Sequence, residues 1–221
     1  MLRLSSILPA LAVGSALVLS PVASDAQRSM ERAPRFEITP LGGYQWGGSF
    51  DTDNFGSVPA GQLEQESSFS WGVILSYLTP ENSAVELIYL RQSTDIRFDP
   101  IGGEVVGLGG FANNYIQLGG RWDLPIELPV RTFISASLGV NVLDPEADVG
   151  TETKFSWGVG GGIRYTFPDQ RIGLRMDLKW LTTPVPSGDY GSWCDFYGCF
   201  VTEGTAWVNQ GQATAGLVFA F

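Results

Sequence analysis

The chain has 221 residues, a length that suits one large all-β domain, and a formal net charge of −10 at pH 7. Such an acidic chain lacks the basic footprint of a nucleic-acid-binding protein, so we expect no nucleic acid partner. Glycine is abundant, with 28 residues, aromatic residues make up 12%, and histidine is absent.

The first residues have the order of a secretory signal peptide. Arg3 precedes an apolar run that ends at about Leu19, and small residues then lead to Ala26. The run is shorter than the ~20 residues that a membrane-spanning helix needs. We therefore expect a signal peptide over residues 1–26 and a short polar lead over residues 27–34, in an exported protein.

From residue 35 onward, apolar and polar side chains alternate along most of the chain. A period of two indicates β-strands, because successive side chains of a strand point to opposite faces. The pattern predicts about eight strands, near or above the ~9–11 residues that cross a bilayer at a tilt. They cover residues 36–46, 68–77, 85–90, 115–122, 133–142, 154–167, 171–182 and 206–221.

The predicted connections alternate in length. The segments at 79–83, 123–130 and 168–170 are short, and those near 48–66, 95–112, 144–153 and 183–205 are longer. Short turns at one end and long loops at the other are typical of bacterial outer-membrane barrels. Acidic residues concentrate in the longer connections, as a solvated surface or as a rim that attracts cations.

The predicted strand over residues 171–182 shows the contrast between the two faces most sharply. One parity is apolar and includes Leu174, Leu178 and Trp180; the other carries Arg175, Asp177 and Lys179. In a membrane barrel the apolar face meets lipid and the charges line the lumen, whereas a soluble barrel reverses the two faces. The apolar faces are too long and too aromatic to fill one small lumen, so we predict the membrane arrangement.

The predicted lumen parity carries eight charged side chains. They are Glu37, Glu86, Arg121, Lys154, Arg164, Arg175, Asp177 and Lys179. Buried charges must be paired or hydrated, and an eight-stranded barrel is only just wide enough for its own side chains. We therefore expect a plug of ion pairs rather than an open pore.

The two cysteines, Cys194 and Cys199, lie in the last long connection. In an exported chain we expect them to form a disulfide across a short loop. Two thiols without a histidine make a poor zinc site, and we expect neither a bound metal nor a cofactor.

Two segments resemble a known family. The ending A-T-A-G-L-V-F-A-F, with Leu217, Phe219 and Phe221 at alternate positions, resembles the assembly signal of bacterial outer-membrane proteins. The opening F-E-I-T-P-L-G-G-Y-Q-W-G-G resembles the first strand of small outer-membrane β-barrel domain proteins, similar in architecture to OmpA, OmpX and OmpW. The resemblance covers residues 35–221 and implies an all-β, eight-stranded antiparallel up-and-down transmembrane barrel in the outer membrane of a Gram-negative-type bacterium. It also implies contact with outer-membrane lipid, lipopolysaccharide and the assembly machinery.

The resemblance does not fix an activity. Enzymes among outer-membrane barrels typically use a histidine, and this chain has none. Lys154 and Lys179, its only lysines, both fall on the lumen parity, where ion pairing is the expected role. The glycine-rich run 158–162 lies inside a strand pattern and is not followed by a helix, so it is no phosphate-binding loop. The calcium-loop-like segment 51–56 fails because Phe55 stands where a ligand is needed.

The sequence therefore favours a non-enzymatic, monomeric outer-membrane barrel with a structural or surface-interaction role. The first alternative is a narrow channel for small solutes or ions. The second is a soluble exported barrel that binds an apolar ligand, which requires the opposite face assignment.

Overall fold

The structure, a computed structural model, describes residues 35–52, 61–126, 129–145, 150–168, 171–185, 194–195, 198–199 and 206–221. The expected signal peptide and lead, residues 1–34, lie outside these ranges, so the division of the chain at residues 26 and 34 stays a prediction. No helix in the described part of the chain has the length and hydropathy of a membrane span.

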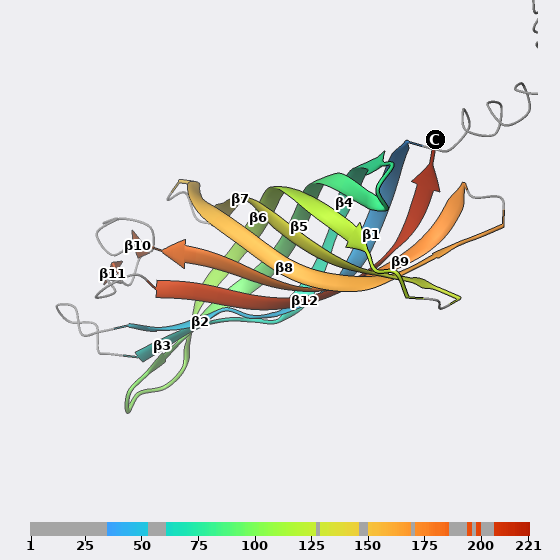
Figure 1. Cartoon of the computed structure of the whole chain (residues 1–221). Helices are drawn as coiled ribbons and strands as arrows, with labels where there is room; N and C mark the ends of the chain where they lie inside the picture. The colour runs from blue at the N-terminus through green and yellow to red at the C-terminus, as the bar shows by residue number, and fades with distance from the viewer. Residues whose placement is uncertain are drawn as a thin grey trace, which may run out of the picture. The chain divides into compact units, whose positions relative to one another are not determined.

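Twelve strands are present in the described residues. They are β1 Phe36–Gly47, β2 Ser49–Thr52, β3 Gly61–Gln65, β4 Ser68–Thr79, β5 Ser83–Pro100, β6 Val106–Asp123, β7 Arg131–Pro145, β8 Glu152–Thr166, β9 Ile172–Val185, β10 Cys194–Asp195, β11 Gly198–Cys199 and β12 Ala206–Ala220. Eight of them, β1, β4 to β9 and β12, form one antiparallel ladder that closes on itself (Figure 1). The predicted eight-stranded up-and-down barrel is confirmed.

The closing contact joins the first strand to the last. β1 pairs with β12 from Glu37↔Ala220 to Gly47↔Gln210. Beyond this ladder, the Phe221 N–H donates to the Phe36 carbonyl at 2.9 Å, and the Arg35 N–H donates to the Phe221 carbonyl at 2.9 Å. Closure pairs the backbone groups of every barrel strand on both sides, as a hydrocarbon environment requires.

The strands are strongly staggered. Following the register once round the barrel, from Trp46 of β1 through β12, β9, β8, β7, β6, β5 and β4, leads back to Phe36 of β1. The stagger is thus 46 − 36 = 10 residues for eight strands. This combination gives tilted strands around a lumen that side chains can fill.

The two faces of the barrel divide as the alternation predicted. On β9, Leu174, Leu178 and Trp180 are 46%, 61% and 50% exposed, whereas Arg175 is 1% exposed. All eight charged residues assigned to the lumen are buried. Because the apolar face points outward, the soluble-barrel alternative, which required the reverse, is wrong.

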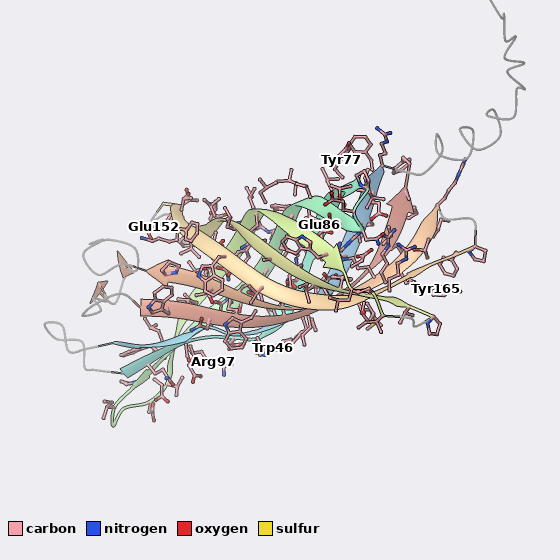
Figure 2. The ribbon with its side chains drawn as sticks, in the orientation of Figure 1. Trp46, Tyr77, Glu86, Arg97, Glu152 and Tyr165 are labelled. Atoms are coloured by element: carbon pink, nitrogen blue, oxygen red, sulfur yellow. The ribbon has the colours of Figure 1, made fainter. Side chains whose placement is uncertain are left out.

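Outward-facing aromatic residues form two belts. The short-turn girdle contains Phe36, Tyr77, Trp122, Tyr165, Phe167, Phe219 and Phe221, and the hairpin-end girdle contains Tyr44, Trp46, Phe69, Trp71, Phe155, Trp180 and Trp207. Figure 2 shows Tyr77 and Tyr165 near one end and Trp46 toward the other. Aromatic belts of this kind mark the two interfaces of a membrane. Leu217, Phe219 and Phe221 all lie on the outward face, as expected, and their assembly role stays a prediction.

Glycines allow the girdle rings to lie flat across neighbouring strands. A Cβ added at Gly211 would come within 2.5 Å of the indole of Trp46, its register partner in β1. A Cβ at Gly120 would come within 2.8 Å of the Trp122 ring. These close approaches explain part of the glycine content of the outward parity.

The long connections differ from the expectation. Segment 95–112 is predicted as a loop, but in the structure β5 and β6 continue through it as one long hairpin, to Pro100 and from Val106. Segment 48–66 is also predicted as a loop, but it contains a second hairpin, β2–β3, in which β3 pairs with β5. Figure 1 shows both hairpins leaving the barrel at the same end. A register shift between Ile96 and Arg97 leaves Leu108 of β6 without a ladder partner, so the alternation is interrupted on β6 while β5 keeps its parity through Phe98.

The cysteines lie opposite each other in the small β10–β11 ladder, with Cys194↔Cys199 as a register pair. Directly opposed residues of antiparallel strands are about 4.5–5.5 Å apart at Cα, within the range that a disulfide spans. The side chains of both residues lie outside the described part, so the disulfide stays a prediction.

The face assignment predicts the effect of one charge placed between the girdles. Leu178→Arg should lower the free energy of unfolding in lipid vesicles by about 2–4 kcal/mol, since arginine near the midplane must leave water. Thr153→Arg is the matched control, because Thr153 is also exposed but lies two residues beyond Phe155 of the hairpin-end girdle. Denaturant titration measures both changes. Equal costs for the two variants would contradict the assigned membrane level.

Candidate functional site: the barrel lumen

The centre of the lumen charge is the guanidinium of Arg175 on β9. Its Nη1 and Nη2 atoms donate to the two oxygens of Glu86 at 2.6 and 3.1 Å, and its Nε and Nη2 donate to the two oxygens of Asp177 at 2.8 Å each. Arg175 therefore holds two carboxylates in bidentate fashion, the geometry that guanidinium groups favour. Glu86 lies on β5, which stands opposite β9 in the closed barrel.

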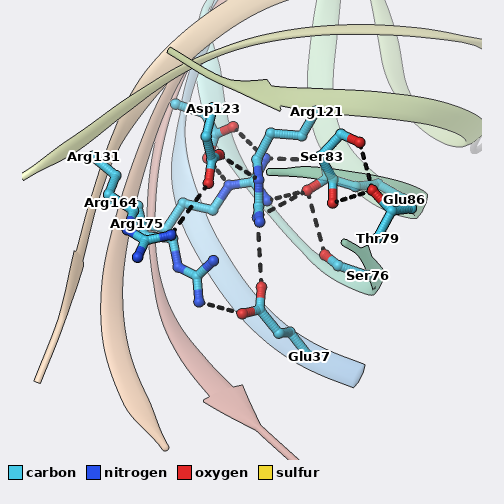
Figure 3. Close-up of polar contacts among 11 residues, drawn as sticks. Glu37, Ser76, Thr79, Ser83, Glu86, Arg121, Asp123, Arg131, Arg164 and Arg175 are labelled. Atoms are coloured by element: carbon cyan, nitrogen blue, oxygen red, sulfur yellow. Dashed lines mark hydrogen bonds and ion pairs between the residues drawn. The ribbon is translucent and has the colours of Figure 1, made fainter. Parts of the chain in front are cut away.

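A second group of ion pairs extends from Arg121 on β6 (Figure 3). Its Nη1 lies 3.5 Å from Glu37 Oε2 and 3.3 Å from Glu86 Oε1, and its Nε lies 3.3 Å from Asp123 Oδ1. Arg164 donates to the other oxygen of Glu37. Through Glu37 and Glu86 these contacts join β1, β5, β6, β8 and β9.

The ring of Phe133 on β7 fills the space beside the two central arginines. The Arg175 Cζ atom lies 4.8 Å from the ring centroid, and the Arg121 Cζ atom lies 5.8 Å from it. Both distances fall within the range of cation–π attraction. The ring therefore packs against both charged groups.

The ionic cluster, as we call it below, is electrically balanced. It contains four basic residues, Arg121, Arg164, Arg175 and Lys179, and four acidic residues, Glu37, Glu86, Asp123 and Asp177. Lys179 interacts electrostatically with Asp177 and Glu86. Balance matters because an unpaired charge in a low-dielectric interior costs several kcal/mol.

The ionic cluster brings together seven of the eight predicted residues. Lys154 is also buried, but it lies at the hairpin end, where its Nζ is 3.4 Å from Glu152 Oε2. Figure 2 shows Glu152 at one end of the barrel and Glu86 well away from it. Asp123 was not predicted as a lumen residue, because its segment was assigned to a connection. It lies at the end of β6, two residues after Arg121 and on the same face of the strand.

An apolar layer follows the ionic cluster along β5, and its residues come from β1, β4, β5, β6 and β9. It consists of the buried side chains Leu41, Ile74, Ile88, Leu90, Leu181 and the ring of Tyr115. The inward residues of β5 show the order within one strand: Glu86 is followed by Ile88 and Leu90, and then by Gln92.

Above the apolar layer, amide side chains form an amide network across the lumen. Gln210 donates to Gln65 at 2.8 Å and to Gln92 at 3.3 Å, and it accepts from Gln45 at 2.9 Å. The chain of donors continues from Asn113 to Gln92 at 3.2 Å and from Asn141 to Asn113 at 3.0 Å. The Tyr115 hydroxyl also donates to Gln210, so the network joins the apolar layer.

These three layers determine what the lumen can do chemically. Many of its polar side chains bond to one another, whereas some buried atoms, such as Gln45 Oε1, Asn141 Oδ1 and Arg164 Nε, have no hydrogen-bond partner in the described protein. Within the described residues, no group of three or more His, Cys, Asp or Glu side chains is placed to hold a metal ion. A small pocket lined by Leu63, Phe111 and Leu143 lies at the hairpin end, above Asn113 and Asn141.

The ionic cluster predicts an asymmetric response to mutation. Arg175→Met should lower the free energy of unfolding by about 3–5 kcal/mol, because it leaves Glu86 and Asp177 buried without their bidentate partner. Arg131→Met is the control: Arg131 is largely exposed and lies 3.8 Å from Asp123, so its loss should cost no more than about 1 kcal/mol. Unfolding in lipid vesicles measures both.

A companion variant separates charge from packing. Adding Glu86→Gln to Arg175→Met should recover part of the loss, since one orphaned charge is removed. A double variant that is less stable than Arg175→Met alone would contradict the pairing described above.

Comparison with solved structures found similar barrels. Neisserial surface protein A is 15% identical over 84% of this chain and 97% of that chain, with a TM-score of 0.54. The outer membrane protein OprG from Pseudomonas aeruginosa is 12% identical over 86% of this chain and 96% of that chain, with a TM-score of 0.57. The outer membrane protein AlkL is 10% identical over 99% of this chain and 97% of that chain, with a TM-score of 0.51.

No protein-family profile matches the chain, and no curated protein sequence was found to be related to it. The likeness to the solved barrels therefore concerns the fold alone. On that basis, and on the apolar outer face, the chain has the fold of the small eight-stranded outer-membrane β-barrels.

Proposed function

We propose that the protein is an integral outer-membrane barrel with a closed lumen, which serves as a structural or surface-interacting protein rather than as an enzyme or an open channel. The observation that carries this proposal is the order of inward residues on β5. Glu86 belongs to the ionic cluster, Ile88 and Leu90 belong to the apolar layer, and Gln92 belongs to the amide network.

Each layer opposes the passage of ions for its own physical reason. The ionic cluster is neutral and internally paired, so a passing ion gains no net attraction there. The apolar layer offers no ligand for an ion that must shed its water, and apolar constrictions exclude water as well. The amide network offers dipoles, but most of its amide groups are bonded to one another; Gln45 Oε1 and Asn141 Oδ1 are the exceptions among them.

The location follows from the outer surface. An apolar belt between two aromatic girdles is stable in a bilayer, and the short turns and long hairpins match the arrangement of barrels in the outer membrane. In this placement the short-turn end faces the periplasm and the β5–β6 hairpin faces outward. Outer-membrane lipid, lipopolysaccharide and the assembly machinery are the expected partners of a monomeric barrel.

The non-enzymatic role rests on the residues available for chemistry. The chain has no histidine to serve as a base. Its two lysines are buried in the lumen, Lys154 beside Glu152 and Lys179 beside the ionic cluster. A serine nucleophile would need one of these lysines as its base, and both lysines already lie beside acidic side chains inside the barrel.

The closed lumen predicts an electrical result. Refolded protein in a planar bilayer should give no stepwise conductance above the bare membrane, because all three layers block the water path. The Arg175→Gln variant should also give no stepwise conductance, since the apolar layer and the amide network remain. A porin inserted into the same bilayer provides the positive control. Reproducible ohmic steps from the wild-type protein would favour the narrow-channel alternative.

The assembly role of the ending predicts a defect in yield. Deletion of Phe221 should lower the amount of folded protein in the outer membrane more than it lowers the stability of the folded fraction. Phe36→Ala is the matched control, because Phe36 is an exposed aromatic residue of the neighbouring strand at the same end of the barrel. Heat-modifiable gel mobility of outer-membrane fractions measures the yield. Wild-type yield after the deletion would contradict the assembly role, and a soluble periplasmic monomer would contradict the proposed location.

A further inference from the structure

Arg91 is an arginine on the outer wall of the barrel at the hairpin-end girdle. Its register partners are Trp71 on β4 and Asn114 on β6, so it stands at the same level as Trp71, which is 51% exposed. It shares the outward parity of β5 with Val85 and Leu87. The residue is half-buried, which is consistent with its aliphatic stem packing on the barrel wall.

Neutral groups hold its guanidinium in place. The Nη1 atom donates to Asn114 Oδ1 at 2.9 Å, and the Tyr89 hydroxyl donates to the same oxygen at 3.2 Å. Asn114 is fixed in turn, since its Nδ2 donates to the Val142 carbonyl at 3.3 Å. The ring of Tyr89 packs edge-on against Trp71, with centroids 6.0 Å apart. The charged group is therefore oriented before any ligand arrives.

Arg91 differs in this respect from Arg97, Arg121 and Arg175. Arg97, six residues along the same outward parity of β5, pairs with Glu66. Arg121 and Arg175 in the lumen pair with several carboxylates. Within the part of the chain that the structure describes, no carboxylate forms an ion pair with Arg91. The amide oxygen of Asn114 accepts a hydrogen bond from one of the five N–H donors of the guanidinium. Because this amide is neutral, it does not neutralise the charge of Arg91.

The surroundings of Arg91 select the anion that completes the site. Tryptophan and tyrosine at a membrane interface sit at the level of the lipid headgroups, so the open side of Arg91 faces that layer. The anion there is phosphate, and a guanidinium binds phosphate through two parallel N–H···O bonds. At the hairpin end, in the placement proposed above, the phosphate of the outer leaflet belongs to lipid A.

We propose that Arg91, oriented by Asn114 and Tyr89 and flanked by Trp71, binds a phosphate of lipid A on the outer wall of the barrel. The inference rests on the proposed outer-membrane placement for the identity of the lipid. The guanidinium and its orientation are properties of the barrel itself.

The test measures binding to folded barrel in a neutral detergent, so that it does not depend on where the protein resides in the cell. Native mass spectrometry compares adducts of diphosphoryl lipid A, enzymatically dephosphorylated lipid A and phosphatidylglycerol. Arg91→Gln should weaken binding of diphosphoryl lipid A about tenfold, the effect expected for one charge-assisted hydrogen-bonded contact. The affinity of Arg91→Lys for diphosphoryl lipid A should lie between those of wild type and Arg91→Gln, because lysine keeps the charge but cannot form the two parallel hydrogen bonds of a guanidinium.

Arg97→Gln is the matched control and should bind as wild type does, because Arg97 is exposed and already paired with Glu66. Heat-modifiable mobility verifies that each variant is folded. Wild-type affinity in Arg91→Gln, or equal binding of the dephosphorylated lipid by the wild-type barrel, would overturn the phosphate site. Phosphatidylglycerol binding equal to that of diphosphoryl lipid A would overturn the choice of lipid A. Absence of the protein from outer-membrane fractions would refute the proposed function while leaving the detergent result intact.

Discussion

Closure of the sheet is the constraint on which the rest of this molecule depends. In hydrocarbon there is no water to satisfy a free backbone N–H or C=O, so the first and last strands must pair along their length. The β1–β12 ladder, extended by the bonds between Phe36 and Phe221, meets this requirement. With eight strands and a stagger of ten residues, closure also fixes a narrow lumen. Every inward side chain must therefore fit against its neighbours in this space.

The ionic cluster fills part of this narrow lumen, and it also affects the register of the strands. Buried ion pairs add little net stability compared with well-packed apolar groups, because both partners lose their hydration. Arg175 and Glu86, however, lie on strands that are not neighbours, and their bidentate contact exists only when the strands keep their register. A slip of one residue in β9 would turn Arg175 and Asp177 toward lipid and Leu174 into the lumen. The charges therefore penalise misregistered barrels strongly.

Alternation in the sequence was sufficient to predict the barrel wall, since a period of two assigns each residue to a face without knowledge of its neighbours. That is why the inward charges of β9 and the outward Leu178 could be predicted. Parity carries no information about height along the barrel, so Lys154 was grouped with charges that lie at the other end. It also says nothing about pairing: the two carboxylates around Arg175 and the position of Phe133 beside it depend on strands far apart in sequence.

The hairpins show a different limit of sequence reasoning. Outside the membrane a strand need not alternate, because both faces can meet water, and the hairpin part of β6 carries glycine at positions 107, 109 and 110. This part of β6 gives no periodic signal, and the few alternating residues of β5 before the turn do not by themselves predict a hairpin. Asp123 was missed for a related reason, since it stands at a strand end where the apolar pattern had already stopped.

The length of the β5–β6 hairpin has a practical consequence for protein engineering. Its strands end at Pro100 and Val106, and its turn contains Gly102 with a φ of 81° and the highly exposed Ile101. Exposed turns of this kind tolerate inserted sequence, because few backbone or packing interactions are lost there. The backbone bonds between Phe36 and Phe221 lie at the opposite end of the barrel. A foreign peptide grafted into residues 101–105 would thus be carried on the β5–β6 hairpin, away from the lipid surface and from the two ends of the barrel sequence.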